Sequence, residues 1–204
     1  MKKLIILLCY FITLSTFSQN VDTIIKTPIY ESHYSFKYKN PIYVKYKLYH
    51  GGGNCNRSQF TFKVDKVKNT ATNNDYSHCG FDEGHLVPAE DFAYDCEKMG
   101  WTFKFYNCLP QTPHLNRGIW KHYESEIRKL SQTDSLEIIC GGVFSNAHLT
   151  NSTVGIPDNC WKIVKSLSTG KIIYALWFDN LMESSSVKNM PLLDLEKKIG
   201  FNVY

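Results

Sequence analysis

Residues 81–128 read FDEGHLVPAEDFAYDCEKMGWTFKFYNCLPQTPHLNRGIWKHYESEIR, and the rest of the chain is organised around this stretch. It opens with a tight turn in which Gly84 stands beside His85, and it ends in a predicted helix that begins near Asn116. Histidine has an ordinary pKa of about 6.5 and accepts protons near neutral pH, and asparagine and glutamate oxygens suit a hard divalent cation. A histidine, two asparagines, a carboxylate and an arginine together favour hydrolysis of a phosphodiester bond around a metal ion.

The predicted helix carries two stripes of side chains. The apolar stripe, which should pack on a sheet, consists of Leu115, Ile119, Tyr123, Ile127 and Leu130. The second stripe lies one residue further on, about 100° around the helix. It consists of Asn116, Trp120, Glu124 and Arg128. Taken singly, Asn116 fits a helix cap and Glu124 with Arg128 fits an ordinary surface pair, so the upstream histidine is what indicates a cleft at this stripe.

The flanking segments predict a sheet on both sides of the helix in sequence. Alternating or β-prone runs predict strands at residues 42–48, 60–64, 136–143, 161–167 and 171–178. Residues 21–40 lack a clear period and are expected to form an arm over the domain. A closing helix is predicted at 191–199, with Gly200 just past its end. This order predicts an α+β fold with a central, mostly antiparallel sheet.

Residues 1–18 have the pattern of a secretory signal peptide. Lys2 and Lys3 precede an apolar run at 4–14, which is too short for a confident membrane span, and small residues follow it. Residues 19–204 are then expected to form one exported domain, in the periplasm or the medium. The formal charge of +4 falls to +2 without Lys2 and Lys3, so any affinity for polyanions must come from local placement of charge.

Six cysteines follow the predicted signal peptide, an even number that favours disulfides in an exported chain. The sequence does not determine their connectivity. Pairing between neighbours would join Cys55 to Cys79, Cys96 to Cys108 and Cys140 to Cys160. A weaker alternative is a zinc site, although the spacings fit no common zinc pattern. It would be built from His78, Cys79, His85, Cys96, Cys108 and His114.

Three motifs in the central stretch closely resemble the DNA/RNA non-specific endonuclease family, the ββα-metal nucleases. They are Phe81-Asp82-Glu83-Gly84-His85-Leu86-Val87-Pro88-Ala89, Asn107-Cys108-Leu109-Pro110-Gln111, and Leu115-Asn116-Arg117-Gly118-Ile119-Trp120 with Glu124. The family signature is Asp-Arg-Gly-His, then Asn-x-x-Pro-Gln, then Leu-Asn-x-x-x-Trp-x-x-x-Glu. The resemblance covers most of residues 19–204 and implies a ββα-metal finger that carries the active site.

The resemblance also implies a one-metal active site. His85 would be the general base that activates water. Asn116 would bind a single divalent ion directly, and Glu124 would hold that ion through water. The expected ion is Mg²⁺, with Mn²⁺ or another divalent ion as the alternative, because magnesium prefers oxygen ligands and keeps several waters.

Four further residues complete the implied site. Asn107 would help to orient it, and Arg128 and Arg57 would stabilise the phosphate. Glu83 departs from the family pattern, which has arginine at this position, and could replace attraction of the phosphate by repulsion worth roughly 3 kcal/mol at about 5 Å. Arg117, Lys121 or Lys104 could restore the positive field.

The leading hypothesis is therefore an exported, magnesium-dependent endonuclease that cuts DNA and RNA without base specificity. The alternative is a catalytically silent nucleic-acid-binding relative in which Glu83 has disabled phosphate binding. DNA and RNA are the expected partners, with no membrane span in residues 19–204. An inhibitor protein and the oligomeric state stay open.

Overall fold

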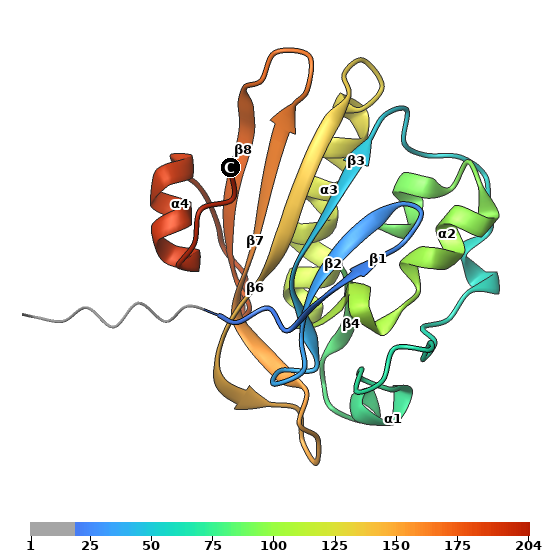
Figure 1. Cartoon of the computed structure of the whole chain (residues 1–204), viewed down its shortest axis with the longest axis vertical. Coiled ribbons are helices and arrows are strands. Elements are labelled where there is room, and N and C mark those ends of the chain that lie inside the picture. Colours follow the sequence, from blue (N-terminus) through green and yellow to red (C-terminus); the bar gives the residue numbers. More distant parts are fainter. Residues whose placement is uncertain (1–18) are drawn as a thin grey trace, which may run out of the picture.

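The computed structural model describes residues 19–204, so the predicted signal peptide lies outside the described part. Its centre is a seven-stranded antiparallel sheet in the order β1-β2-β3-β6-β7-β8-β9 (Figure 1). The strands are β1 (Thr23–Lys26), β2 (Tyr30–Ser35), β3 (Asn40–Leu48), β6 (Leu136–His148), β7 (Gly155–Ser166), β8 (Ile172–Asp179) and β9 (Val187–Asn189). The prediction of an α+β fold around an antiparallel sheet is confirmed. Among residues 19–204, no helix is both long and apolar enough to span a membrane.

Successive side chains of a strand point to opposite faces of the sheet. Apolar side chains on both faces are covered by other parts of the chain. On one face, Trp161 and Ile163 pack against Leu195 and Ile199 of helix α4 (Leu192–Ile199), which lies apart from the other helices in Figure 1. Gly200 ends this helix in a left-handed conformation with φ of 84°, as the sequence predicts. The other face carries the larger core cluster.

The second face supports a smaller ββα unit. Strands β4 (Asp82–His85) and β5 (Cys108–Gln111) pair antiparallel, and the helical turn η4 (Leu115–Trp120) leads into helix α3 (Lys121–Leu130). The backbone leaves helical geometry at Gly118, with φ of −102° and ψ of −111°, so the predicted continuous helix is kinked. This unit is the expected finger. The remaining short helices are η1 (Arg57–Gln59), α1 (Asn73–Tyr76), η2 (Ala89–Phe92), α2 (Cys96–Thr102) and η3 (Phe105–Asn107).

Three local predictions are wrong. Residues 21–40 mostly form the hairpin β1–β2 rather than an arm. The alternation of apolar and polar residues is hard to see in β2, because the polar residue Ser32 occupies a buried position. Its hydroxyl donates to the carbonyl of Tyr106 at 2.6 Å. Residues 60–64 form no strand, and only Lys63 makes an isolated bridge there. Trp120 is fully buried rather than part of a cleft floor.

A disulfide is present as expected, but the expected pairing of the cysteines is wrong. Cys55 is bonded to Cys96, which lies 41 residues later in the chain. The Cys55 amide also donates to the carbonyl of Ala93, so the backbone of Cys55 lies next to the start of helix α2. Cys140 and Cys160 lie on adjacent strands but stand opposite Lys162 and Gly142 rather than each other. Four cysteines within residues 19–204 are free, namely Cys79, Cys108, Cys140 and Cys160.

Candidate active site

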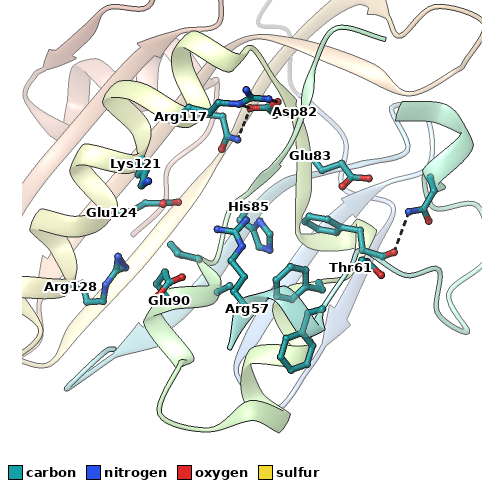
Figure 2. Close-up of a pocket in the computed structure, with 17 residues that line it drawn as sticks. Arg57, Thr61, Asp82, Glu83, His85, Glu90, Arg117, Lys121, Glu124 and Arg128 are labelled. Atoms are coloured by element: carbon teal, nitrogen blue, oxygen red, sulfur yellow. Dashed lines mark hydrogen bonds and ion pairs between the residues drawn. The ribbon is translucent and has the colours of Figure 1, made fainter. Parts of the chain in front are cut away.

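A cleft of about 840 Å³ lies between the finger and the segment that follows Cys55 (Figure 2). Its charged lining is balanced. The acidic side chains are Asp82, Glu83, Glu90 and Glu124, and the basic ones are Arg57, Arg117, Lys121 and Arg128. A charge-balanced cleft of this size requires an additional cation, or precise placement of individual charges, to hold a polyanion.

His85 ends strand β4 at the centre of this cleft. Its ring lies 4.5 Å from the Phe62 ring and 4.8 Å from the Phe103 ring, between centroids, and the residue is only 6% exposed. Burial, assisted by the positive charge of Arg57, lowers the pKa of His85 to about 3. The buried Nε2 atom has no hydrogen-bond partner among residues 19–204. His85 is therefore a neutral base with a free nitrogen.

Asn116 is oriented by a carboxylate. Its Nδ2 donates to Asp82 at 2.9 Å, and no residue within the described chain donates to its amide oxygen. Arg117 holds the same carboxylate through two hydrogen bonds, of 2.8 Å from Nε and 2.6 Å from Nη2. Burial raises the pKa of Asp82, but the hydrogen bonds from Arg117 and Asn116 outweigh burial and leave this pKa below its usual value. The amide oxygen of Asn116 is thus left as a ligand atom at the cleft.

Glu124 lies on α3 beside a buried cation. Burial raises the pKa of Glu124 to about 7, although the positive charge of Lys162 opposes this shift. Lys162 is 0% exposed, and its Nζ lies 4.0 Å from the centroid of the Trp120 ring. Within the part of the chain that the structure describes, this Nζ has no hydrogen-bond partner. The positive charge of Lys162, on strand β7 of the main sheet, therefore acts on Glu124 in the cleft.

Two arginines reach the cleft from different elements. Arg128, on α3, donates through Nη1 to the buried carboxylate of Asp91 at 2.7 Å. Arg57, on η1, is exposed, and its guanidinium carbon lies 5.9 Å from the centroid of the Phe103 ring. Figure 2 shows Arg57 next to His85 and Arg128 on the helix side.

Glu83 lines the same cleft as His85, two residues earlier on β4, which places both side chains on one face of the strand. In Figure 2 His85 lies between Glu83 and Glu124. Burial, with a contribution from Asp82, raises the pKa of Glu83. Within residues 19–204, no basic side chain forms an ion pair with Glu83.

Asn107 lies behind the cleft rather than in its lining. It is 0% exposed, its Oδ1 accepts from the Val87 amide at 2.9 Å, and its Nδ2 donates to the carbonyls of Val87 and Thr102. It therefore fixes the backbone that follows His85. Trp120 acts similarly, because its Nε1 donates to the His85 carbonyl at 3.2 Å.

The structure thus brings six of the seven predicted site residues to one cleft and places Asn107 directly behind it. The cations proposed to compensate for Glu83 are only partly available. Lys121 lines the cleft and Arg117 is paired with Asp82, whereas Lys104 is paired with Asp65 at 3.2 Å and does not line the cleft.

Sequence reasoning assigned no role to three supporting residues: Asp82, Asp91 and Lys162. The first two were visible as acidic residues flanking the histidine turn, but their partners lie 34 to 37 residues away. Lys162 lies in the strand predicted at 161–167, but its burial beneath Trp120 is a long-range contact.

The donor set fits a hard divalent ion that keeps most of its waters. Asn116 offers an unused amide oxygen, and Glu124 offers a carboxylate about two helical turns later. No group of three or more His, Cys, Asp or Glu side chains within residues 19–204 could hold a metal ion. The alternative zinc site is also unsupported, because Cys96 is consumed by the disulfide.

Comparison with known proteins gives consistent results. A sequence model described as DNA/RNA non-specific endonuclease matches residues 12–203. A protein named nuclease from Nostoc sp. is 32% identical over 148 residues, covering 70% of this chain and 54% of the relative. Mitochondrial endonuclease G from Bos taurus is 38% identical over 93 residues, covering 44% of this chain and 31% of the relative. The chain thus spans about half the length of the first relative and about a third of the second.

A solved structure shares the fold. A chain in the crystal structure of the EndoG/EndoGI complex, which addresses the mechanism of EndoG inhibition, aligns with a TM-score of 0.75 and 20% identity. The alignment covers 89% of this chain and 85% of that one. At this identity the likeness establishes the fold alone.

Proposed function

Because the chain belongs to the DNA/RNA non-specific endonuclease family, we propose that it is an exported, divalent-metal-dependent hydrolase that cuts phosphodiester bonds in DNA and RNA. One observation carries the proposal. His85, a neutral base with an unpartnered Nε2, lines the same cleft as Asn116 and Glu124. The charged groups of the cleft suit phosphate and metal rather than base edges, so no base specificity is expected.

The proton-transfer step belongs to His85. Its low pKa keeps the imidazole neutral, so Nε2 can accept a proton from water that attacks the phosphorus. The imidazolium that forms would be costly between two phenylalanine rings beside Arg57. A bound phosphate supplies the compensating negative charge, which couples proton transfer to substrate binding.

The phosphate is held by the chain's own cations. Arg57 and Arg128 line the cleft from opposite elements, and guanidinium groups match phosphate oxygens through paired N–H donors. Their positive charge offsets the charge that builds up on the phosphate in the transition state.

Asn116 and Glu124 are proposed to hold the divalent ion, with Mg²⁺ the first candidate. Such an ion would supply Lewis-acid stabilisation of the phosphate and of the departing oxygen. Asp82 keeps the Asn116 amide in the orientation that leaves its oxygen available. Such a cation would favour phosphate binding in a cleft whose charged lining is otherwise balanced.

The test is cleavage of supercoiled plasmid and of single-stranded RNA by residues 19–204, with Mg²⁺ and with a chelator. We expect cleavage of both substrates only with the metal, and a loss of about 10²–10⁴-fold in His85→Ala, the usual contribution of a general base. His122→Ala is the matched control, because His122 is exposed on α3 and does not line the cleft. Equal turnover by wild type and His85→Ala would remove the base assignment.

Glu83 supports a second candidate, a nucleic-acid-binding relative without catalysis. Its carboxylate lies in the cleft and has no ion-pair partner among the described residues, so it opposes an incoming phosphate. This candidate predicts binding without cleavage by the wild type and cleavage by Glu83→Arg.

The charge-reversal variant tests both candidates. Replacing a repulsion of roughly 3 kcal/mol at about 5 Å by attraction should raise kcat/KM at least tenfold. Glu90→Arg makes the same charge change at another position of the cleft lining and is the control. If both variants gain equally, the effect is general electrostatics, and the specific role assigned to Glu83 is wrong.

A further inference from the structure

Asp91 is a buried carboxylate behind the wall of the cleft, where it pairs with Arg128. It follows the histidine turn on the short helix η2, is 1% exposed and does not line the cleft. Both carboxylate oxygens are nevertheless engaged. Oδ1 accepts from Nη1 of Arg128 at 2.7 Å, and Oδ2 accepts from the Tyr46 hydroxyl at 3.1 Å.

The backbone of Asp91 is fixed as firmly as its side chain. Its amide donates to the Pro88 carbonyl at 3.2 Å, and its carbonyl accepts from the Gly52 amide at 3.4 Å. Tyr46 is itself a buried residue of the central strand β3. The carboxylate is therefore attached to the main sheet on one side and to a cleft arginine on the other.

We propose that Asp91 is a positioning residue that fixes the guanidinium of Arg128 at the wall of the cleft. The inference rests on the proposed function, in which Arg128 neutralises the phosphate. The ion pair occupies Nη1, and within residues 19–204 no other side chain accepts a hydrogen bond from this guanidinium. The remaining N–H groups of Arg128 thus stay available to a phosphate.

Fixing this side chain before substrate arrives should favour the chemical step. Arginine has many rotamers, and an arginine that is already ordered loses less entropy when a phosphate binds. Asp91 also reduces the net positive charge near the cleft by one. Removing its charge should therefore leave KM unchanged or lower it, while kcat falls because Arg128 is no longer aligned.

A double-mutant cycle separates this role from a purely structural one. Asp91→Asn keeps the shape of the side chain and removes its charge, and we expect kcat to fall about 10- to 100-fold, as for other misplaced catalytic groups. In an Arg128→Met background the same substitution should change kcat by less than about threefold, because the partner is already absent. Equal losses in both backgrounds would overturn the proposal.

Tyr46→Phe provides a second variant if Asp91→Asn does not fold. It removes the hydrogen bond at Oδ2 and retains both charges, so it should cause a smaller loss in kcat that also disappears in the Arg128→Met background. A loss that persists there contradicts the proposal.

NMR of the arginine side chains gives a readout that does not depend on turnover. The Nη hydrogens of Arg128 should give separate resonances in the wild type, because the ion pair slows rotation of the guanidinium, and averaged resonances in Asp91→Asn. Identical spectra would overturn the placement of Arg128 by Asp91. If the wild type cleaves neither DNA nor RNA, the proposed function fails, and the NMR comparison still decides whether Asp91 holds Arg128.

Discussion

His85 shows how an apolar enclosure keeps an imidazole neutral. Phe62 and Phe103 exclude water from the ring, and Arg57 adds a positive charge, so the neutral imidazole is favoured over the imidazolium. The enclosure has a thermodynamic cost at acidic pH, because the unfolded chain binds a proton that the folded chain rejects.

Replacing His85 should therefore change the pH dependence of stability. The folded pKa of about 3 lies below the unfolded value of about 6.5, so stability falls as pH drops below about 6.5 and continues to fall toward 3. Between pH 7 and 5, the free energy of unfolding should decrease by about 2 kcal/mol more in wild type than in His85→Asn. Urea unfolding of both proteins in chelator at the two pH values measures this difference. Equal decreases would mean that His85 titrates normally in the folded protein.

At the scale of elements, the finger depends on a close approach between its two strands. Gly84 pairs with Leu109, and a Cβ at this position would lie 2.2 Å from Oε1 of the fully buried Gln111. Only glycine allows β4 and β5 to pack in this way. The adjacent residue is His85, so the packing of the hairpin also sets the position of the proposed base.

Gly84→Ala should disturb both stability and activity. We expect a loss of about 1–3 kcal/mol from overpacking, and a fall in turnover of about 10²-fold from displacement of His85. Gly100→Ala in α2 is the control, because the added methyl meets only the Phe60 ring edge, at 3.3 Å, and alanine favours a helix. Thermal unfolding and plasmid cleavage measure the two effects. Similar behaviour of the two variants would contradict the close-packing argument.

At the scale of the whole molecule, the disulfide between Cys55 and Cys96 closes the part of the chain that carries Arg57 and strand β4. Residues 60–64 lack the ladder of a regular strand, so this segment has few backbone hydrogen bonds of its own. The covalent link therefore restricts the wall of the cleft opposite α3.

Removing this link should destabilise the protein strongly. Closure of a loop of 41 residues is worth about 4 kcal/mol in the chain-entropy description, which corresponds to roughly 10 °C in Tm for a domain of this size. Cys55→Ser/Cys96→Ser should show this loss, and its Tm should no longer respond to reductant. Cys79→Ser is the control, because Cys79 is a free, half-buried thiol and should leave the sensitivity to reductant intact. An unchanged Tm in the double variant would show that the link adds no stability.

Patterns along the chain predicted the features that depend on residues close together in sequence. Alternation predicted strand β3, and β-prone runs predicted strands β6, β7 and β8. Pro191 and Gly200 predicted the two ends of helix α4. The motifs and their resemblance to the family selected six residues that line one cleft, on η1, on strand β4 and on the helical segment η4–α3.

The electrostatics of the cleft and the pairing of the cysteines depend on residues that meet only in the folded protein. The low pKa of His85 depends on Phe62 and Phe103, which lie 23 and 18 positions away along the chain, and the charge behind Glu124 comes from Lys162 on the main sheet. Cys55 meets Cys96 only because the chain folds back onto α2. Burial and charge proximity depend on distance in space, which a period or a motif along the chain does not contain.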